Sequence, residues 1–580
     1  MPGFYISNDS FLPSQFDEKK ENFVTNVLQK ENICCARQTG NKFLNDKIFY
    51  EDENYIIITE GVILNLRDLE ARNNVKSLEA LIIKLAKKER PFYSLFRGTF
   101  SGAVFFKERN EWIIYTGQHG EHNIFYYKTG DKYYIGSEVG YLLEIIKKNK
   151  YPISIDEQAI YYMLTYGYMV DESTYAKEIK CLLPGHVLKI RNGEIEIEQY
   201  YNLEKNTIDL SNKSEDEIIN ELDEKFRLAV QLQFDKDDEY GLEHLADLSG
   251  GLDSRMVNWV ARDLGYTGIL NINYCYSNHL DEIIAKQIAG KLGNEIILFP
   301  LDTGKFIFDL DDTVKKSGGL ALYIGNTGCM RLLENLNVNR YGLKHGGNLG
   351  DVIVGSFLKD EKQEKVIEQD GMYSKLLSNC YNDSTSRKYM DQELYLMNVR
   401  GFMANCACSS GILRNWSEMV SPFQNIEFLE YCMSIPVQLR KKHYIYKRWI
   451  QKKYPEAAKF VWQKEEVDLQ SFIDSPYLWI NQRIRKYCHR IIDNIKQLIN
   501  RMSFGKMEFI NKKDMNPMDY WYRNNPNIKK FMDDYFQSNI EVLHLQKKMK
   551  DDICRLYCTG NAYDKSLALT AISAVKYYFN

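Results

Sequence analysis

Residues 245–261 have the sequence LADLSGGLDSRMVNWVA. The segment begins as an apolar run, passes through SGGLDS at 249–254 and continues with helical periodicity. A glycine-rich turn between a buried strand and a helix presents backbone N–H groups, which form an anion-binding site with the helix N-terminus. Gly250 and Gly251 can adopt positive φ angles and let phosphate oxygens reach the backbone, while Ser249 and Ser254 add hydroxyl donors. The segment therefore predicts a phosphate-binding loop.

Asp253 indicates that a cation accompanies the phosphate, because a carboxylate repels a phosphate that approaches it directly. Mg²⁺ is the natural choice, since it prefers oxygen ligands and is usually shared with substrate phosphates. The chain contains no GxxxxGK[ST] segment, so this loop is not a Walker A loop.

The segments around this loop alternate between strand and helix. We expect helices at 218–234, after 253 and at 280–292, and strands at 244–248, 269–276 and 295–300. This order is typical of a parallel, doubly wound sheet. Residues before about 200 are instead rich in short strands, with Tyr55–Thr59, Phe100–Phe106 and Trp112–Tyr115 as examples. The polar stretch 202–217 separates the two regions, and we expect domains at 1–205 and 212–580, the second mainly helical from about 360.

Composition excludes several classes of protein. The 580 residues carry a net charge of −4 and no Lys/Arg block, which favours a small-molecule or peptide substrate over nucleic acid. The twelve cysteines lack the spacing of a zinc site. The chain begins without a signal-peptide pattern and contains no apolar run near the ~20 residues that span a bilayer. We therefore expect a cytoplasmic protein without a membrane partner.

The SGGLDS loop resembles the pyrophosphate-binding loop of the N-type ATP pyrophosphatases, which cleave ATP between the α and β phosphates to adenylate a carbonyl oxygen. Segments 278–292, 345–355, 417–430 and 460–465 are similar, in the same order, to motifs of the asparagine synthetases. The resemblance implies ATP and Mg²⁺ as cofactors and a nucleotide-binding sheet of the adenine nucleotide α-hydrolase-like (HUP) class. It implies ATP or pyrophosphate binding by Ser249, Gly250, Gly251, Leu252, Asp253, Ser254 and Gly347, metal binding by Asp253 and Asp351, and catalysis by Lys464, with Lys447 as a second basic position.

The N-terminal region resembles the class II glutamine amidotransferases at 95–106, 117–127, 135–143 and 182–186, which implies an Ntn-hydrolase-like α/β/β/α sandwich. That family opens Met-Cys-Gly, whereas this chain opens Met1-Pro2-Gly3. Pro2 therefore occupies the position of the lost glutaminase nucleophile, and a ring carbon cannot attack glutamine. Glu60-Gly61 replaces the Asn-Gly pair that holds glutamine in the family. We expect a domain that keeps the fold for a structural role without the hydrolase activity.

A further departure is Asn348, which stands where asparagine synthetases carry a glutamate near the reaction centre. The β-lactam synthetases and lasso-peptide macrolactam synthetases resemble this chain in having a glutaminase-like domain without its cysteine. Asn cannot act as a general base near neutral pH, so the base stays open. We expect an AMP-forming amide synthetase that joins a carboxylate to an amine, first of all in macrolactam formation and otherwise in lactam, sugar or peptide amidation. A precursor peptide, its leader protease and a second copy of the chain are candidate partners.

Three other functions are open from the sequence. One is an asparagine synthetase that uses ammonia, and Pro2 and Asn348 are evidence against it. Another is a non-catalytic scaffold that retains the fold, against which the intact set of Ser249, Asp253, Asp351 and Lys464 speaks. A tRNA-thiolating enzyme is the most distant, because no cysteine pair has suitable spacing. No motif assigns a role to residues 471–580.

Overall fold

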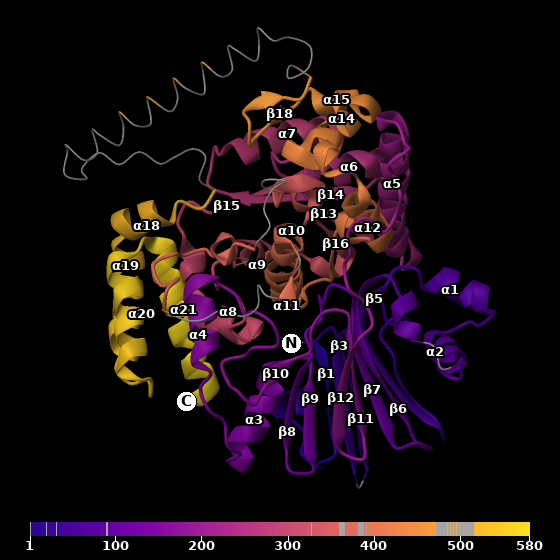
Figure 1. Ribbon diagram of the computed structural model, residues 1–580, viewed down its shortest axis with the longest axis vertical. Coiled ribbons are helices and arrows are strands. Elements are labelled where there is room, and N and C mark those ends of the chain that lie inside the picture. The colour runs from indigo at the N-terminus through magenta and orange to yellow at the C-terminus, as the bar shows by residue number, and fades with distance from the viewer. Residues whose placement is uncertain are drawn as a thin grey trace.

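The computed structural model describes residues 2–470 and 515–580, apart from residues 19, 31, 89–90, 326, 359–365, 381–387 and 390. Between 471 and 514 it describes only isolated helical positions. Figure 1 shows a strand-rich N-terminal part, a second part built on a parallel sheet, and a group of C-terminal helices beside them.

The N-terminal part is an α/β/β/α sandwich, as the resemblance implied. Two antiparallel sheets of six strands each, with orders β10-β8-β9-β1-β3-β2 and β12-β11-β7-β6-β5-β4, face each other. Residues such as Phe4, Ile58 and Trp112 fill the space between them. Helices α3 and α4 share a core with the first sheet, and α1 and α2 share one with the second. The elements are β1 (Gly3–Ser7), β2 (Phe23–Lys30), β3 (Ile33–Gly40), β4 (Phe49–Glu51), β5 (Tyr55–Ile63), α1 (Leu66–Asn73), α2 (Leu78–Ala86), β6 (Gly98–Phe106), β7 (Glu111–Thr116), β8 (Phe125–Thr129), β9 (Lys132–Gly136), α3 (Val139–Asn149), α4 (Glu157–Thr165), β10 (Lys180–Cys181), β11 (His186–Arg191) and β12 (Glu194–Gln199).

Strands β1–β4 were not predicted from the sequence. Strand β3 buries Arg37, Gln38 and Thr39 next to one another, so it lacks the alternation of apolar and polar residues that marks a half-buried strand. Strand β2 is only half-buried and lies at the edge of its sheet. Both strands are defined by pairing with each other and with β1, which is a long-range property of the sheet.

The second part contains a five-stranded parallel sheet with the order β15-β14-β13-β16-β17, which confirms the predicted doubly wound class. Its strands are β13 (Glu243–Asp247), β14 (Ile269–Cys275), β15 (Glu295–Pro300), β16 (Tyr341–His345) and β17 (Met419–Val420). Helices α5 (Glu215–Glu239), α6 (Asp253–Asp263) and α7 (Leu280–Leu292) accompany it. The strand order reverses between β13 and β16, and ligands bind at such a switch point outside the carboxyl ends of the strands. The SGGLDS loop follows β13 and the 346–351 loop follows β16, so both lie at this point.

The C-terminal helices are α18 (Met518–Asn524), α19 (Pro526–Ile540), α20 (Lys547–Thr559) and α21 (Ala562–Phe579). They lie beside α4 of the sandwich and α8 (Leu310–Ser317) of the second part (Figure 1). Ala571 of α21, Ile160 of α4 and Val314 of α8 belong to one buried cluster. The C-terminal helices therefore bridge the two parts of the chain. No helix in the described part of the chain is long and apolar enough to cross a membrane.

Buried charges also join the two parts. Glu418, immediately before β17, accepts from His122 Nε2 at 2.9 Å and lies 3.2 Å from Lys47 Nζ. Arg414 donates to Glu138 at 2.9 Å. Lys47, His122 and Glu138 come from the sandwich, and all these side chains are nearly inaccessible to solvent. Such pairs are costly to break from one side, which fixes the sandwich against the parallel sheet.

Candidate active site

The SGGLDS loop connects β13 to α6, but its geometry differs from the expectation. Neither Gly250 nor Gly251 is among the residues with positive φ. Glycine is needed at 250 for close packing instead, because a Cβ there would lie 3.0 Å from Gln463 Cβ and from Ile284 Cδ1. Three of the loop amides already have partners. Ser249 N donates to Ser254 Oγ at 3.0 Å, Gly250 N to Asp281 Oδ1 at 2.8 Å and Gly251 N to Ser249 Oγ at 3.2 Å. A bound phosphate must replace these partners or use the amides that follow.

The structure brings Asp253 and Asp351 together, 98 residues apart in sequence. Asp351 N donates to Asp253 Oδ2 at 3.0 Å, and Tyr446 OH donates to Asp253 Oδ1 at 2.9 Å. Burial, and then the nearby charge of Asp351, raise the pKa of Asp253 to about 7. Two carboxylates that repel each other across a pocket are a suitable oxygen ligand set for a divalent cation.

Gly347 and Gly350 are required by the close approach of the second loop to Asp253. A Cβ at Gly347 would lie 2.6 Å from Ser254 N, and a Cβ at Gly350 would lie 2.4 Å from Asp253 Cγ. Any side chain at these positions would therefore separate the two carboxylates. Gly347 lines a pocket together with Asp253 and Ser254.

A pocket of about 240 Å³ opens at this edge of the sheet. It is lined by Asp247, Leu248, Ser249, Gly251, Asp253, Ser254, Ile272, Asn273, Tyr274, Asp281, Gly347, Asn348 and Met515. Its position at the strand-order switch is that expected of a nucleotide site in an open α/β sheet. Asn348 belongs to the lining, and its Nδ2 makes a weak 3.7 Å contact with Met419 Sδ. Leu252 is buried within the loop and does not line the pocket.

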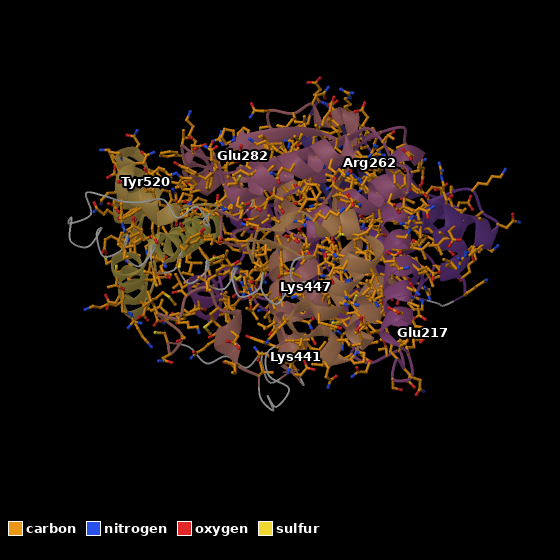
Figure 2. All side chains as sticks on the ribbon, turned by 90° about the horizontal axis from the view of Figure 1, so that it is seen from above. Glu217, Arg262, Glu282, Lys441, Lys447 and Tyr520 are labelled. Atoms are coloured by element: carbon orange, nitrogen blue, oxygen red, sulfur yellow. The ribbon has the colours of Figure 1, made fainter. Side chains whose placement is uncertain are left out.

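Basic side chains flank the carboxylates. Lys464, between the short strands β18 (Val461–Trp462) and β19 (Val467–Asp468), lies with Nζ 4.0 Å from Asp351 Oδ2 and is about half exposed. The ammonium groups of Lys464 and Lys447 lie 6.0 and 5.8 Å from the centre of the Trp462 ring. Figure 2 labels Lys447 near the centre of the view from above. Two lysines on one aromatic ring beside two aspartates can hold an anionic leaving group through direct attraction.

His443 and Ser356 extend this basic side of the site. Ser356 Oγ donates to Asp351 Oδ2 at 2.6 Å, and His443 Nε2 lies 3.3 Å from the same hydroxyl. Burial, and then the positive charge of Lys464, lower the pKa of His443 to about 4. His443 is therefore neutral at physiological pH and orients Ser356 and Asp351 without adding charge.

At the N-terminus, Pro2 is buried and Gly3 pairs with Gln38. Cys34 and Cys35 pair with Ser7 and Ile6, so they lie about 14 Å and about 10 Å further along β1 than Gly3, at about 3.4 Å per residue. Burial raises the pKa of the Cys34 thiol to about 11 and that of Cys35 still further. Neither thiol can replace the missing nucleophile near neutral pH, because the thiolate is the reactive form.

Glu60 is also unsuited to hold glutamine. Its carboxylate accepts from Thr39 Oγ1 at 2.9 Å and lies 3.8 Å from Arg37 Nε, with both charges buried. Gly61 beside it has φ +90°, and a Cβ there would lie 2.0 Å from the Thr99 carbonyl oxygen. Glycine is therefore required at 61, while a buried ion pair occupies the side-chain position of residue 60.

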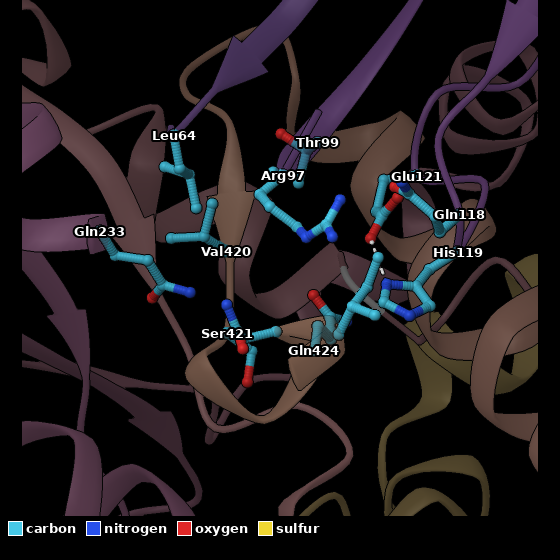
Figure 3. Close-up of a pocket in the computed structure, with 13 residues that line it drawn as sticks. Leu64, Arg97, Thr99, Gln118, His119, Glu121, Gln233, Val420, Ser421 and Gln424 are labelled. Atoms are coloured by element: carbon cyan, nitrogen blue, oxygen red, sulfur yellow. Dashed lines mark ion pairs between the residues drawn. The ribbon is translucent and has the colours of Figure 1, made fainter. Parts of the chain in front are cut away.

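A second, much smaller cavity of about 30 Å³ lies where the sandwich meets the parallel sheet (Figure 3). Arg97, His119 and Glu121 line it from one part of the chain, and Gln233, Ser421 and Gln424 from the other. Its volume has room for about one or two water molecules. It does not share a lining residue with the pocket around Asp253.

Sequence reasoning gave no role to Asp247, Asp281 and Tyr446, which the structure places in or against the site. Asp247 could have been found, because a carboxylate between the apolar residues Ala246 and Leu248, just before the loop, is unusual. Tyr446 lies in a helix almost 200 residues from Asp253, and no local pattern connects the two.

The protein is an α/β protein in which an α/β/β/α sandwich of the Ntn-hydrolase type precedes a doubly wound parallel sheet with a glycine-rich loop at its strand-order switch. Residues 44–201 match the family model described as a glutamine amidotransferase domain. The chain is similar to asparagine synthetase [glutamine-hydrolyzing] 1 of Bacillus subtilis (strain 168), with 24% identity over 293 residues that cover 47% of this chain and 44% of that protein. Together these matches support the asparagine synthetase and class II glutamine amidotransferase family; the chain spans less than half the length of that relative.

Other similarities are shorter or weaker. A stretch of 101 residues, 17% of this chain, is 31% identical to eukaryotic peptide chain release factor subunit 1-2 of Brassica oleracea var. botrytis, of which it covers 21%. The solved structure of glutamine phosphoribosylpyrophosphate amidotransferase from B. subtilis is similar at 11% identity and a TM-score of 0.26, covering 51% of this chain and 90% of that one. The NH3-dependent NAD synthetase from Campylobacter jejuni is similar at 18% identity and a TM-score of 0.18, covering 25% and 61%.

Proposed function

We propose that this protein is an ATP- and Mg²⁺-dependent, AMP-forming amide synthetase. A substrate carboxylate attacks the α-phosphorus of ATP, pyrophosphate leaves, and an amine then displaces AMP from the acyl-adenylate. The observation that carries the proposal is the meeting of Asp253, Asp351 and Lys464 beside a glycine-rich loop at the strand-order switch. Similarity to an asparagine synthetase supports an ATP-dependent amide-forming ligase at the level of the family.

Each part of the site has a role in this proposal. Asp253 and Asp351 would hold Mg²⁺, which supplies Lewis-acid stabilisation of the leaving pyrophosphate. Ser249, Ser254 and the amides of the loop would hold the pyrophosphate itself. Lys464, assisted by Lys447, would stabilise the negative charge that develops on the α-phosphate and later on the tetrahedral acyl centre.

The nucleophile of the second step is proposed to be an amine carried by a substrate. Three observations argue against a supply of ammonia from glutamine. Pro2 stands in place of a nucleophile, Cys34 and Cys35 are distant and protonated, and the Arg37–Glu60 ion pair stands where the family's Asn-Gly pair holds glutamine. We place macrolactam closure of a ribosomal peptide first among the reactions, with a precursor peptide and its leader protease as partners. Formation of a smaller lactam or amidation of a sugar or peptide comes next, and the enzyme would act in the cytoplasm.

An asparagine synthetase is the alternative that the Bacillus subtilis relative favours, and in this chain it would use ammonia because Pro2 stands in place of the glutaminase nucleophile. The two reactions share the first half and differ in substrates. Incubation with aspartate, ammonium and ATP separates them, because stoichiometric asparagine and AMP would establish the alternative. Asn348 and Pro2 lead us to expect no asparagine.

The proposal is tested by ATP–pyrophosphate exchange and by analysis of the nucleotide product. We expect exchange with a candidate carboxylate, and AMP with no ADP as the product. Asp253→Asn should abolish exchange, whereas Glu243→Gln at the opposite, exposed end of the same strand should leave it unchanged. ADP as the product would refute the proposed cleavage, and unaltered exchange by Asp253→Asn would refute the site.

A further inference from the structure

Asp247 is the last residue of the central strand β13 and lines the nucleotide pocket together with Asp253 and Asn348. It also lies near the start of the second loop. A Cβ at Gly346 would lie 3.3 Å from Asp247 Oδ2 and 3.6 Å from Asn348 Oδ1, so the two side chains flank the same point of the backbone. Asp247 thus presents a carboxylate between the two loops that follow β13 and β16.

Lys344 of the neighbouring strand holds this carboxylate in place. Its ammonium group forms a close ion pair with Asp247 Oδ2, and its side chain is only 2% exposed. Burial disfavours the charged lysine, but the attraction of Asp247 outweighs burial and raises the pKa of Lys344. Lys344 is therefore a permanent cation that fixes the orientation of Asp247.

The other oxygen of Asp247 is unused. Asp247 Oδ1 is buried and has no hydrogen-bond partner among the residues that the structure describes. An unsatisfied buried acceptor costs about 1–3 kcal/mol, and more when the group is charged, so such an atom in a pocket indicates a donor that arrives with a ligand. The other carboxylates of the described pocket have partners, since Asp281 accepts from Gly250 N and Asp253 from Tyr446 and Asp351.

We propose that the carboxylate of Asp247, whose side chain is partly exposed at the pocket, binds the amine that attacks the acyl-adenylate. This inference rests on the proposed function and names the group that receives its second substrate. A carboxylate repels the acid and the phosphates of the first half-reaction, whereas it attracts an ammonium ion and accepts N–H hydrogen bonds from a neutral amine. Because Asp247 lies at the carboxyl end of β13, the bound amine would lie beside the nucleotide. The class of substrate that this carboxylate would bind is a primary amine.

The test measures methylamine binding to the full chain by calorimetry, after saturation with Mg²⁺ and α,β-methylene-ATP. Magnesium occupies Asp253 and Asp351, which leaves Asp247 as the proposed acceptor. We expect saturable binding to the wild type and a loss of at least about tenfold in affinity in Asp247→Asn, as for one charge-assisted hydrogen bond. The loss of methylamine affinity in Asp247→Asn should exceed any loss of nucleotide affinity, and Glu243→Gln should behave as the wild type.

A double variant, Asp247→Asn with Lys344→Met, removes both charges of the pair, so that no buried cation is left unpaired and folding is kept. It should lose methylamine binding as the single variant does. Wild-type protein that binds the nucleotide but not methylamine would overturn the inference, as would undiminished binding by Asp247→Asn. If Asp247→Asn weakens the nucleotide instead, Asp247 contacts the ribose or the base, and the inference is wrong. Failure of the wild type to bind the nucleotide at all would refute the proposed function and this inference with it.

Discussion

Replacement of Glu418 by glutamine should destabilise the protein far more than the same replacement at Glu427. Glu418 is buried and lies 2.9 Å from His122 Nε2 and 3.2 Å from Lys47 Nζ, so its neutralisation leaves a buried cation without its partner. Breaking a buried pair from one side costs about 3–5 kcal/mol. Because glutamine still accepts a hydrogen bond, we expect a loss of unfolding free energy at the lower end of this range, about 3 kcal/mol.

Glu427 provides a matched control for this replacement. It also joins the two parts of the chain, through a 2.7 Å ion pair with Arg97, but its side chain is 51% exposed. An exposed pair contributes about 1 kcal/mol or less, because water and salt screen it. If the distance between the paired atoms alone decided the loss of stability, Glu427→Gln would be the more destabilising change. The difference in burial predicts that Glu418→Gln is more destabilising.

The assay is urea denaturation of the wild type and both variants, with comparison of the midpoint of the same transition, because a chain of this size need not unfold in a single step. The pH dependence gives an independent check. Burial would raise the pKa of Glu418, but the attraction of His122 and Lys47 outweighs it and holds the pKa well below its usual value. The stabilisation is then present above the pKa of an unfolded glutamate, about 4.3, and is lost as the pH falls further.

The difference between wild type and Glu418→Gln should therefore be largest near pH 7 and shrink as the pH falls below about 4. Equal shifts of the midpoint in the Glu418 and Glu427 variants at pH 7 would refute the reasoning. A difference that grows on acidification would also contradict it, since Glu418 would then not be the ionised partner of the pair.

Three further changes address the site directly. Asp253→Asn should abolish magnesium-dependent ATP binding in calorimetry, and retained binding would remove Asp253 from the metal site. Lys464→Met should lower the rate of ATP–pyrophosphate exchange by about 10²–10³ with a smaller effect on ATP affinity, while Lys452→Met on the exposed face of α14 (Tyr444–Lys453) should leave the rate unchanged. Gly250→Ala should reduce the rate of exchange because the added Cβ meets Gln463 and Ile284. Gly251→Ala should be tolerated better, because its Cβ meets only a serine hydroxyl. Equal rates in the two alanine variants would show that the loop can shift.

The sequence was informative where structure depends on neighbours along the chain. The alternation of apolar strands and amphipathic helices predicted the parallel sheet, and the limits of α7 and β15 agree with the prediction to the residue. The prediction that Pro2 stands in place of a glutaminase nucleophile also came from the residue type alone. Where burial hid the alternation, as at Arg37–Thr39 in β3, the pattern was lost and the strand was not predicted.

Sequence alone therefore determined the class of sheet, the presence of a loop suited to phosphate and the loss of a nucleophile, because each depends on residues that are close in the chain. Only the tertiary structure decided that Asp351 and Tyr446 meet Asp253, that Asp247 keeps an unpartnered oxygen, and that α21 packs against the sandwich. The physical reason is that these contacts depend on how strands and helices far apart in sequence pack, and on which polar atoms that packing removes from water.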